Sequence, residues 1–131
     1  MVRVVILTLM LFVNALVNAQ TDSLDCDKSF EYYDDLFGES LIVVWDTPPS
    51  IRECSLKNIS ALKELVKKHT HYSYIFVDLI INPKGAPICF RFKQKLRPEI
   101  KAIFIEELKK LHFKPAKQKE KEVESIYMLR I

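Results

Sequence analysis

The chain has 131 residues, enough for one globular domain, and its composition is ordinary apart from its two glycines. Its formal net charge of +3 is too small to indicate a nucleic acid or an anionic membrane surface as the partner. Composition therefore points to a small globular protein.

Residues 1–19 are predicted to be a signal peptide. Arg3 supplies a positive start, Val4–Val17 is an apolar run of fourteen residues, and small residues precede a cleavage site at Ala19-Gln20. The run is short for a membrane span, which needs about twenty residues. Cleavage is therefore the prediction and retention as an anchor the alternative, and the mature protein is expected to be periplasmic or secreted.

Residues 20–50 are predicted to form an acidic N-terminal segment. Asp22–Glu39 holds seven acidic residues and one lysine, whereas the rest of the mature chain is basic. This segment can either pack on the basic body or stay solvated. Phe30–Phe37 has a weak helical spacing, and Leu41–Trp45 predicts an extra strand that Pro48-Pro49 would end.

Three cysteines, Cys26, Cys54 and Cys89, allow one disulfide and leave one thiol. Export would place them where disulfides persist. The sequence leaves all three pairings open, and Cys54–Cys89 is one that the positions of the two residues allow. None of the spacings resembles a zinc site, and no cofactor is predicted.

Residues 51–131 are predicted to form the folded domain, which starts with an amphipathic helix over Ser55–His69. His69 and His71 follow as an His-x-His pair. Such a pair can bind a metal from one face of a strand, but the sequence offers no obvious third ligand. Histidines near a helix C-terminus also interact favourably with the helix dipole, and we prefer that interpretation.

Tyr72–Phe92 is predicted to be a β-hairpin around Asn82-Pro83-Lys84-Gly85. With Asn82 opposite Gly85, one face collects the apolar residues Ile75, Val77, Leu79, Ile81, Ala86, Ile88, Phe90 and Phe92. The other face carries Tyr74, Phe76, Asp78, Cys89, Arg91 and Lys93. A two-stranded ribbon is only marginally stable alone, so another element must cover the apolar face.

Pro98–Leu111 is the predicted cover, because its apolar residues recur at helical spacing. The charged stretch Lys117–Glu122 is predicted to be a linker. Val123–Ile131 then alternates as a strand, with Glu124, Ile126, Met128 and Arg130 on its more polar face. The predicted fold class is α+β, a small antiparallel sheet of order strand, strand, helix, strand packed on amphipathic helices.

The last sixty residues resemble the TonB C-terminal domain family. The features that carry the resemblance occur in a fixed order: VDLIINPKG at Val77–Gly85, Phe90–Phe92, the helix Pro98–Leu111, the FKPA motif at Phe113–Ala116, and Val123. Relatives typically have a glycine-containing step where this chain has Lys117–Lys121. The resemblance implies a periplasmic domain that binds an outer-membrane receptor.

By this resemblance, the partner is an extended peptide or an outer-membrane receptor segment that adds a strand beside the final strand. Ile126, Met128 and Arg130 are the candidate partner-binding residues. The alternative is that this strand is an ordinary sheet member with a solvated edge. A homodimer is a further possibility.

The resemblance leaves two functions open, a stand-alone exported module and a short TonB-type energy transducer anchored by an uncleaved N-terminal helix. A transducer also needs a long spacer across the periplasm, and the chain before the domain is too short for that. We therefore predict the non-enzymatic module. An exported enzyme is the third hypothesis, and Asp78 its candidate carboxylate, although pairing with Arg91 is the simpler expectation.

Overall fold

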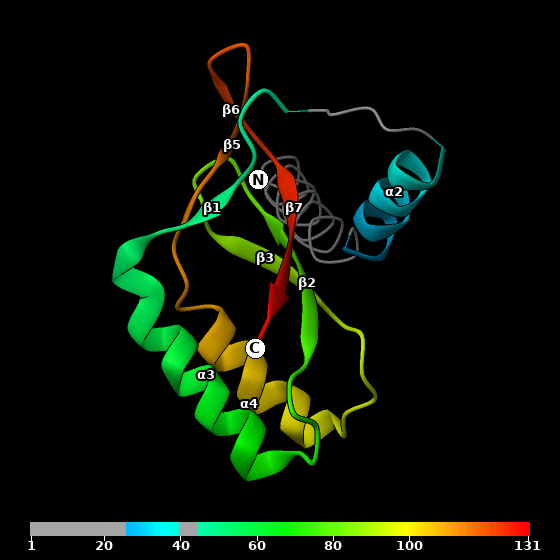
Figure 1. Ribbon diagram of the computed structural model, residues 1–131. Coiled ribbons are helices and arrows are strands. Elements are labelled where there is room, and N and C mark those ends of the chain that lie inside the picture. The colour runs from blue at the N-terminus through cyan, green and yellow to red at the C-terminus, as the bar shows by residue number, and fades with distance from the viewer. Residues whose placement is uncertain (1–25, 40–44) are drawn as a thin grey trace, which may run out of the picture. The chain divides into compact units, whose positions relative to one another are not determined.

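The computed structural model describes residues 26–39 and 45–131 (Figure 1). Within these residues there are three α-helices and several small antiparallel sheets, so the α+β class is confirmed. The predicted signal peptide and most of the predicted strand Leu41–Trp45 lie outside the described residues. The chain divides into two compact units, residues 1–38 and 39–131, and each is described by itself.

The first unit contributes helix α2 (Cys26–Glu39), which extends the predicted helical stretch Phe30–Phe37 at both ends. Phe30 and Tyr33, three residues apart, are buried. Tyr33 and Phe37, four residues apart, stack with their ring centroids 6.4 Å apart. Residues three and four apart are neighbours on a helix surface, so these aromatic residues lie on one face of α2.

The second unit is built on a three-stranded antiparallel sheet of order β3-β2-β7. Strand β2 (Phe76–Ile81) lies between β3 (Pro87–Phe92) and β7 (Ser125–Arg130). Helices α3 (Leu56–His69) and α4 (Pro98–Leu108) pack against each other and against one face of this sheet (Figure 1). The hairpin and the last strand therefore share one sheet, and the hairpin, α4 and the last strand follow one another along the chain in the predicted order.

The core lies between this sheet and the two helices. Its alternate strand residues point toward the helices, as the period of two requires. The members of the core are Leu62, Val66, Ile75, Val77, Leu79, Ile81, Phe104, Leu108, Leu111, Phe113, Leu129 and Ile131. Burial of one such side chain stabilises a fold by about 1.5–3 kcal/mol, so this apolar face holds the main sheet against the two helices.

The hairpin has a different register from the predicted one. The Asn82 amide donates to the carbonyl of the residue after Gly85 at 2.9 Å, and a β-bulge at Ile88 follows. The turn pairing and the bulge each shift the register by one residue, so the remaining pairs differ by two from the predicted ones and Leu79 pairs with Phe90. A shift of two leaves Phe90 on its predicted face, but the bulge leaves Ile88 exposed, which makes the prediction for Ile88 wrong.

Helix α3 starts within one residue of the predicted position, whereas α4 ends at Leu108 instead of Leu111. The amides of Lys110 and Leu111 donate to carbonyls three residues back, at 3.2 and 3.1 Å, so the chain tightens into a final turn. Leu111 remains buried, as the helical spacing predicted.

The charged stretch predicted as a linker is a β-hairpin. Strand β5 (Ala116–Gln118) pairs with β6 (Lys121–Val123) across a turn at Lys119 and Glu120. Both turn residues have positive φ, 51° and 67°, as tight hairpin turns require. Glycine or asparagine usually occupies such positions, so the sequence contains no signal for this turn.

A second small sheet pairs β1 (Ser50–Ile51) with β4 (Phe113–Lys114). The turn of the β2–β3 hairpin lies directly against β4, since the Phe113 amide donates to the Gly85 carbonyl at 2.9 Å. Gly85 has φ +88°, and a Cβ there would lie 2.0 Å from the Phe113 carbonyl oxygen. This close backbone approach connects the hairpin to the segment after α4.

Candidate functional site

Strand β7 is an edge of the main sheet. Its inner side pairs with β2, and at the end of the pair Ile75 and Ile131 exchange two hydrogen bonds of 3.0 and 2.9 Å. Hydrogen-bonded and non-bonded pairs alternate along an antiparallel ladder. The backbone N–H and C=O groups of Ile126, Met128 and Arg130 therefore point away from β2, and we call this side the outer edge of β7.

The outer edge has no strand beside it among the described residues. Strand β7 pairs with β2 over six consecutive residues without a register shift and contains no proline. Such an edge presents unpaired donors and acceptors at regular spacing, which is what an added strand requires.

The other edge of the sheet, on β3, is less suited to an added strand. Pro87 opens β3 and has no N–H to donate, and the bulge at Ile88 interrupts the regular spacing of the edge. Prolines and bulges are two devices by which proteins block edge pairing. The comparison of the two edges selects β7.

The three predicted partner-binding side chains lie together on the sheet face that points away from α3 and α4. Met128 is 63% exposed, Arg130 is exposed and Ile126 is half-buried. Arg130 pairs in register with Phe76, and its guanidinium carbon lies 5.6 Å from the centroid of the Tyr74 ring. Tyr74 in turn contacts Phe76 edge-on at 5.4 Å. The outer edge therefore has an amphipathic surface beside it.

Tyr74 was not among the predicted site residues. Alternation placed it on the correct face, but its contact with Arg130 depends on pairing between two distant segments. A sequence signal existed in the exposed aromatic run before the hairpin, Tyr72 and Tyr74, since exposed aromatic residues often contribute to interfaces.

Asp78 is held by cations, in agreement with the simpler expectation. Its carboxylate oxygen Oδ2 accepts hydrogen bonds from Arg91 Nη2 at 2.8 Å and Nε at 3.1 Å, and Lys93 Nζ lies 2.9 Å away. The Asp78 side chain is 5% exposed, so a carboxylate there needs such partners. This arrangement joins β2 to β3 and explains Asp78 without a reaction.

His69 and His71 lie at the C-terminal end of α3. His69 closes α3, and the exposed His71 has its ring 5.7 Å from that of Tyr72. Within residues 26–39 and 45–131, no three His, Cys, Asp or Glu side chains are close enough to hold a metal ion.

The state of the three cysteines excludes one disulfide pairing that the sequence allowed. Cys26 and Cys89 are disulfide-bonded, whereas Cys54 is a free and exposed thiol. A Cys54–Cys89 bond is therefore wrong. Cys54 lies in the short 3-10 helix Glu53–Ser55 that leads into α3, at the surface of its unit.

In the described part of the chain, no helix is both long enough and apolar enough to span a bilayer. Comparisons of the chain with protein-family profiles, curated proteins and solved structures give no match. The resemblance to the TonB C-terminal domain family thus stays a prediction.

Proposed function

We propose that this protein is a non-enzymatic periplasmic interaction module that binds an extended peptide or an outer-membrane receptor segment by strand addition at the outer edge of β7. The observation that carries the proposal is the row of outward N–H and C=O groups at Ile126, Met128 and Arg130. These are the residues that the TonB-like interpretation assigned to the partner.

Two further features support it. The order of β2, β3, α4 and β7 agrees with the order expected from the TonB C-terminal domain resemblance. Disulfide bonding of Cys26 and Cys89 suits an oxidising compartment such as the periplasm. Backbone pairing would supply affinity, and the surface around Met128 and Tyr74 would supply selectivity.

The test uses peptides selected from a random decapeptide display library on the purified full chain. Met128→Pro removes one outward N–H and leaves the β2–β7 ladder intact, because edge strands tolerate proline at such positions. We expect about tenfold weaker peptide binding, measured by fluorescence anisotropy. Met128→Ala keeps the N–H and is the matched control for the lost side chain.

Equal affinities for the wild type and Met128→Pro would exclude strand addition at β7. Urea unfolding of both proteins accompanies the titration, so that a loss of folded protein is not read as a loss of affinity. Crosslinking in intact cells from a photoreactive residue at Met128, with Leu56 on α3 as the exposed control position, would then identify the natural partner.

The transducer alternative differs at the N-terminus. An energy transducer would keep residues 1–19 as an anchor, whereas the proposed module loses them. Intact-mass measurement of the exported protein distinguishes the two, because a mass that begins at Gln20 excludes an anchor.

A further inference from the structure

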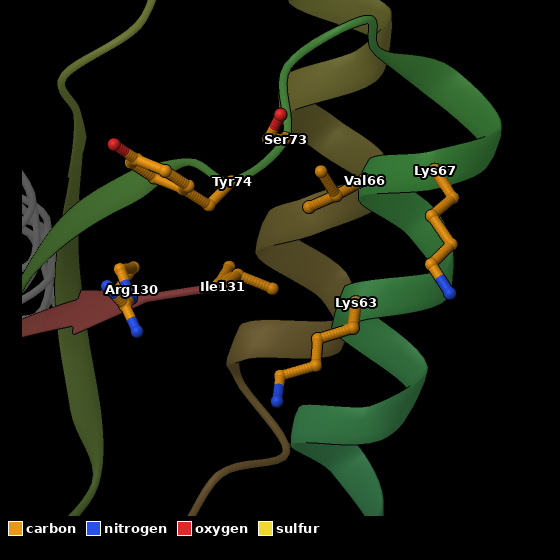
Figure 2. Close-up of a pocket in the computed structure, with 7 residues that line it drawn as sticks. All are labelled: Lys63, Val66, Lys67, Ser73, Tyr74, Arg130 and Ile131. Atoms are coloured by element: carbon orange, nitrogen blue, oxygen red, sulfur yellow. The ribbon is translucent and has the colours of Figure 1, made fainter.

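The outer edge of β7 leads to a pocket at the end of the strand. This pocket has a volume of about 370 Å³ and lies between α3, the end of β7 and the segment before β2 (Figure 2). It is lined by Lys63, Val66, Lys67, Ser73, Tyr74, Arg130 and Ile131. We call it the basic pocket.

Three of the seven lining residues are cationic: Lys63, Lys67 and Arg130. Lys67 lies 3.6 Å from Glu64, and both side chains are exposed, so this pair neutralises little. Lys63 forms no ion pair with any described residue, and Arg130 faces an aromatic ring. These three side chains therefore give the pocket a positive charge.

The basic pocket is continuous with the outer edge. Arg130 belongs to both, since its main chain is the last outward position of β7 and its side chain lines the pocket. Figure 2 shows Lys63 extending from α3 past Ile131, with its amino group on the side away from Tyr74. Tyr74 leads into β2, so Lys63 reaches toward the side on which a strand would add.

We propose that the segment that pairs with β7 carries an aspartate or glutamate at the end that passes Arg130, and that this side chain enters the basic pocket between Lys63 and Arg130. This inference rests on the proposed function and adds the chemistry of the partner. A carboxylate there gains charge-assisted hydrogen bonds, whereas an apolar residue gains none. The anchor also fixes the register of an added strand, which backbone pairing alone leaves free to slip.

The experiment uses blocked decapeptides of alternating valine and threonine, with a glutamate at the N-terminal end, at the C-terminal end, or replaced by glutamine. Binding to the full chain is measured by fluorescence anisotropy at about 0.05 M and about 0.5 M salt. We expect one glutamate position to bind roughly three- to tenfold more tightly than glutamine at low salt, and the gain to shrink at high salt. The favoured position then gives the strand direction.

Four variants test whether the tighter binding of the glutamate peptide arises at the basic pocket. Lys63→Gln and Arg130→Gln are expected to remove it, whereas Lys57→Gln, an exposed lysine on the same helix, should keep it. Lys63→Glu should reverse the preference, so that a terminal lysine in place of the glutamate restores binding.

Two outcomes overturn the inference while leaving strand addition in place: no preference for glutamate at either end, or a preference that Lys63→Gln and Arg130→Gln do not change. Peptides whose binding is insensitive to Met128→Pro would instead refute the proposed function. The inference about the anchor would then fail with it.

Discussion

Gly85 is a position at which the fold should tolerate a side chain poorly. Its φ of +88° is costly for a residue with a side chain, by about 1–2 kcal/mol. An added Cβ would also lie 2.0 Å from the Phe113 carbonyl oxygen, so the two backbones must separate by about 1 Å to reach an ordinary contact. That movement breaks the 2.9 Å hydrogen bond from the Phe113 amide to the Gly85 carbonyl, which costs about another 1 kcal/mol.

We therefore expect Gly85→Ala to lower the free energy of unfolding by about 2–4 kcal/mol, even after alanine's smaller unfolded-state entropy is credited. The assay is urea unfolding followed by circular dichroism. Gly85→Asn is the discriminating control, because asparagine accepts a positive φ but carries the same Cβ. Equal losses for both variants indicate the backbone contact as the cause, and substantial rescue by asparagine would refute it.

Two further stability predictions concern single polar groups. Glu107→Gln should cost about 0.5 kcal/mol at neutral pH, because the Lys110 side chain is exposed and solvent weakens its pair with Glu107. The Lys110 hydrogen bond lowers the pKa of the Glu107 carboxyl below 4.5, desolvation by burial opposes this, and the Asn58 hydrogen bond adds to the lowering. A carboxyl whose pKa is lowered in the folded state stabilises the fold above its unfolded-state pKa of 4.5, and this stabilisation is lost as the pH falls through the folded-state pKa. The urea midpoints of the wild type and of Glu107→Gln should therefore converge in acid. A constant difference between the two midpoints would contradict this prediction. Ser125→Ala should be neutral or stabilise by up to about 1 kcal/mol, because the buried Ser125 hydroxyl has no hydrogen-bond partner among the described residues; a clear loss in the same assay would indicate one.

The faces of the last strand were predicted from a local pattern, although the strand begins at Ser125 and the predicted first residue, Val123, belongs to β6. Its alternation separated Leu129 and Ile131, which are buried, from Met128 and Arg130, which are exposed. A period of two leaves one solution when one face must be buried, so a local pattern sufficed. The same alternation was enough to place Ile126, Met128 and Arg130 together on the opposite face.

Three features could not be predicted from the sequence. The bulge at Ile88 gives the hairpin a shape that a simple alternating pattern does not encode. The turn at Lys119 and Glu120 lacks the residues that usually mark it. The basic pocket joins Lys63 on α3 to Arg130 on β7, and only the packing of α3 on the sheet brings them together.

The proposed function places partner recognition on the side of β7 opposite to the side that stabilises the fold. Its inward groups and core residues, such as Leu129, fix the strand on β2, whereas its outward groups at Ile126, Met128 and Arg130 contribute nothing to that ladder. A destabilising change such as Gly85→Ala should therefore reduce binding only by reducing the folded fraction, and the wild-type affinity should return under conditions in which the variant is fully folded. Met128→Pro should reduce affinity in fully folded protein. Both effects are expected if a partner binds the edge of β7, whereas a partner that binds elsewhere on the fold would show only the first.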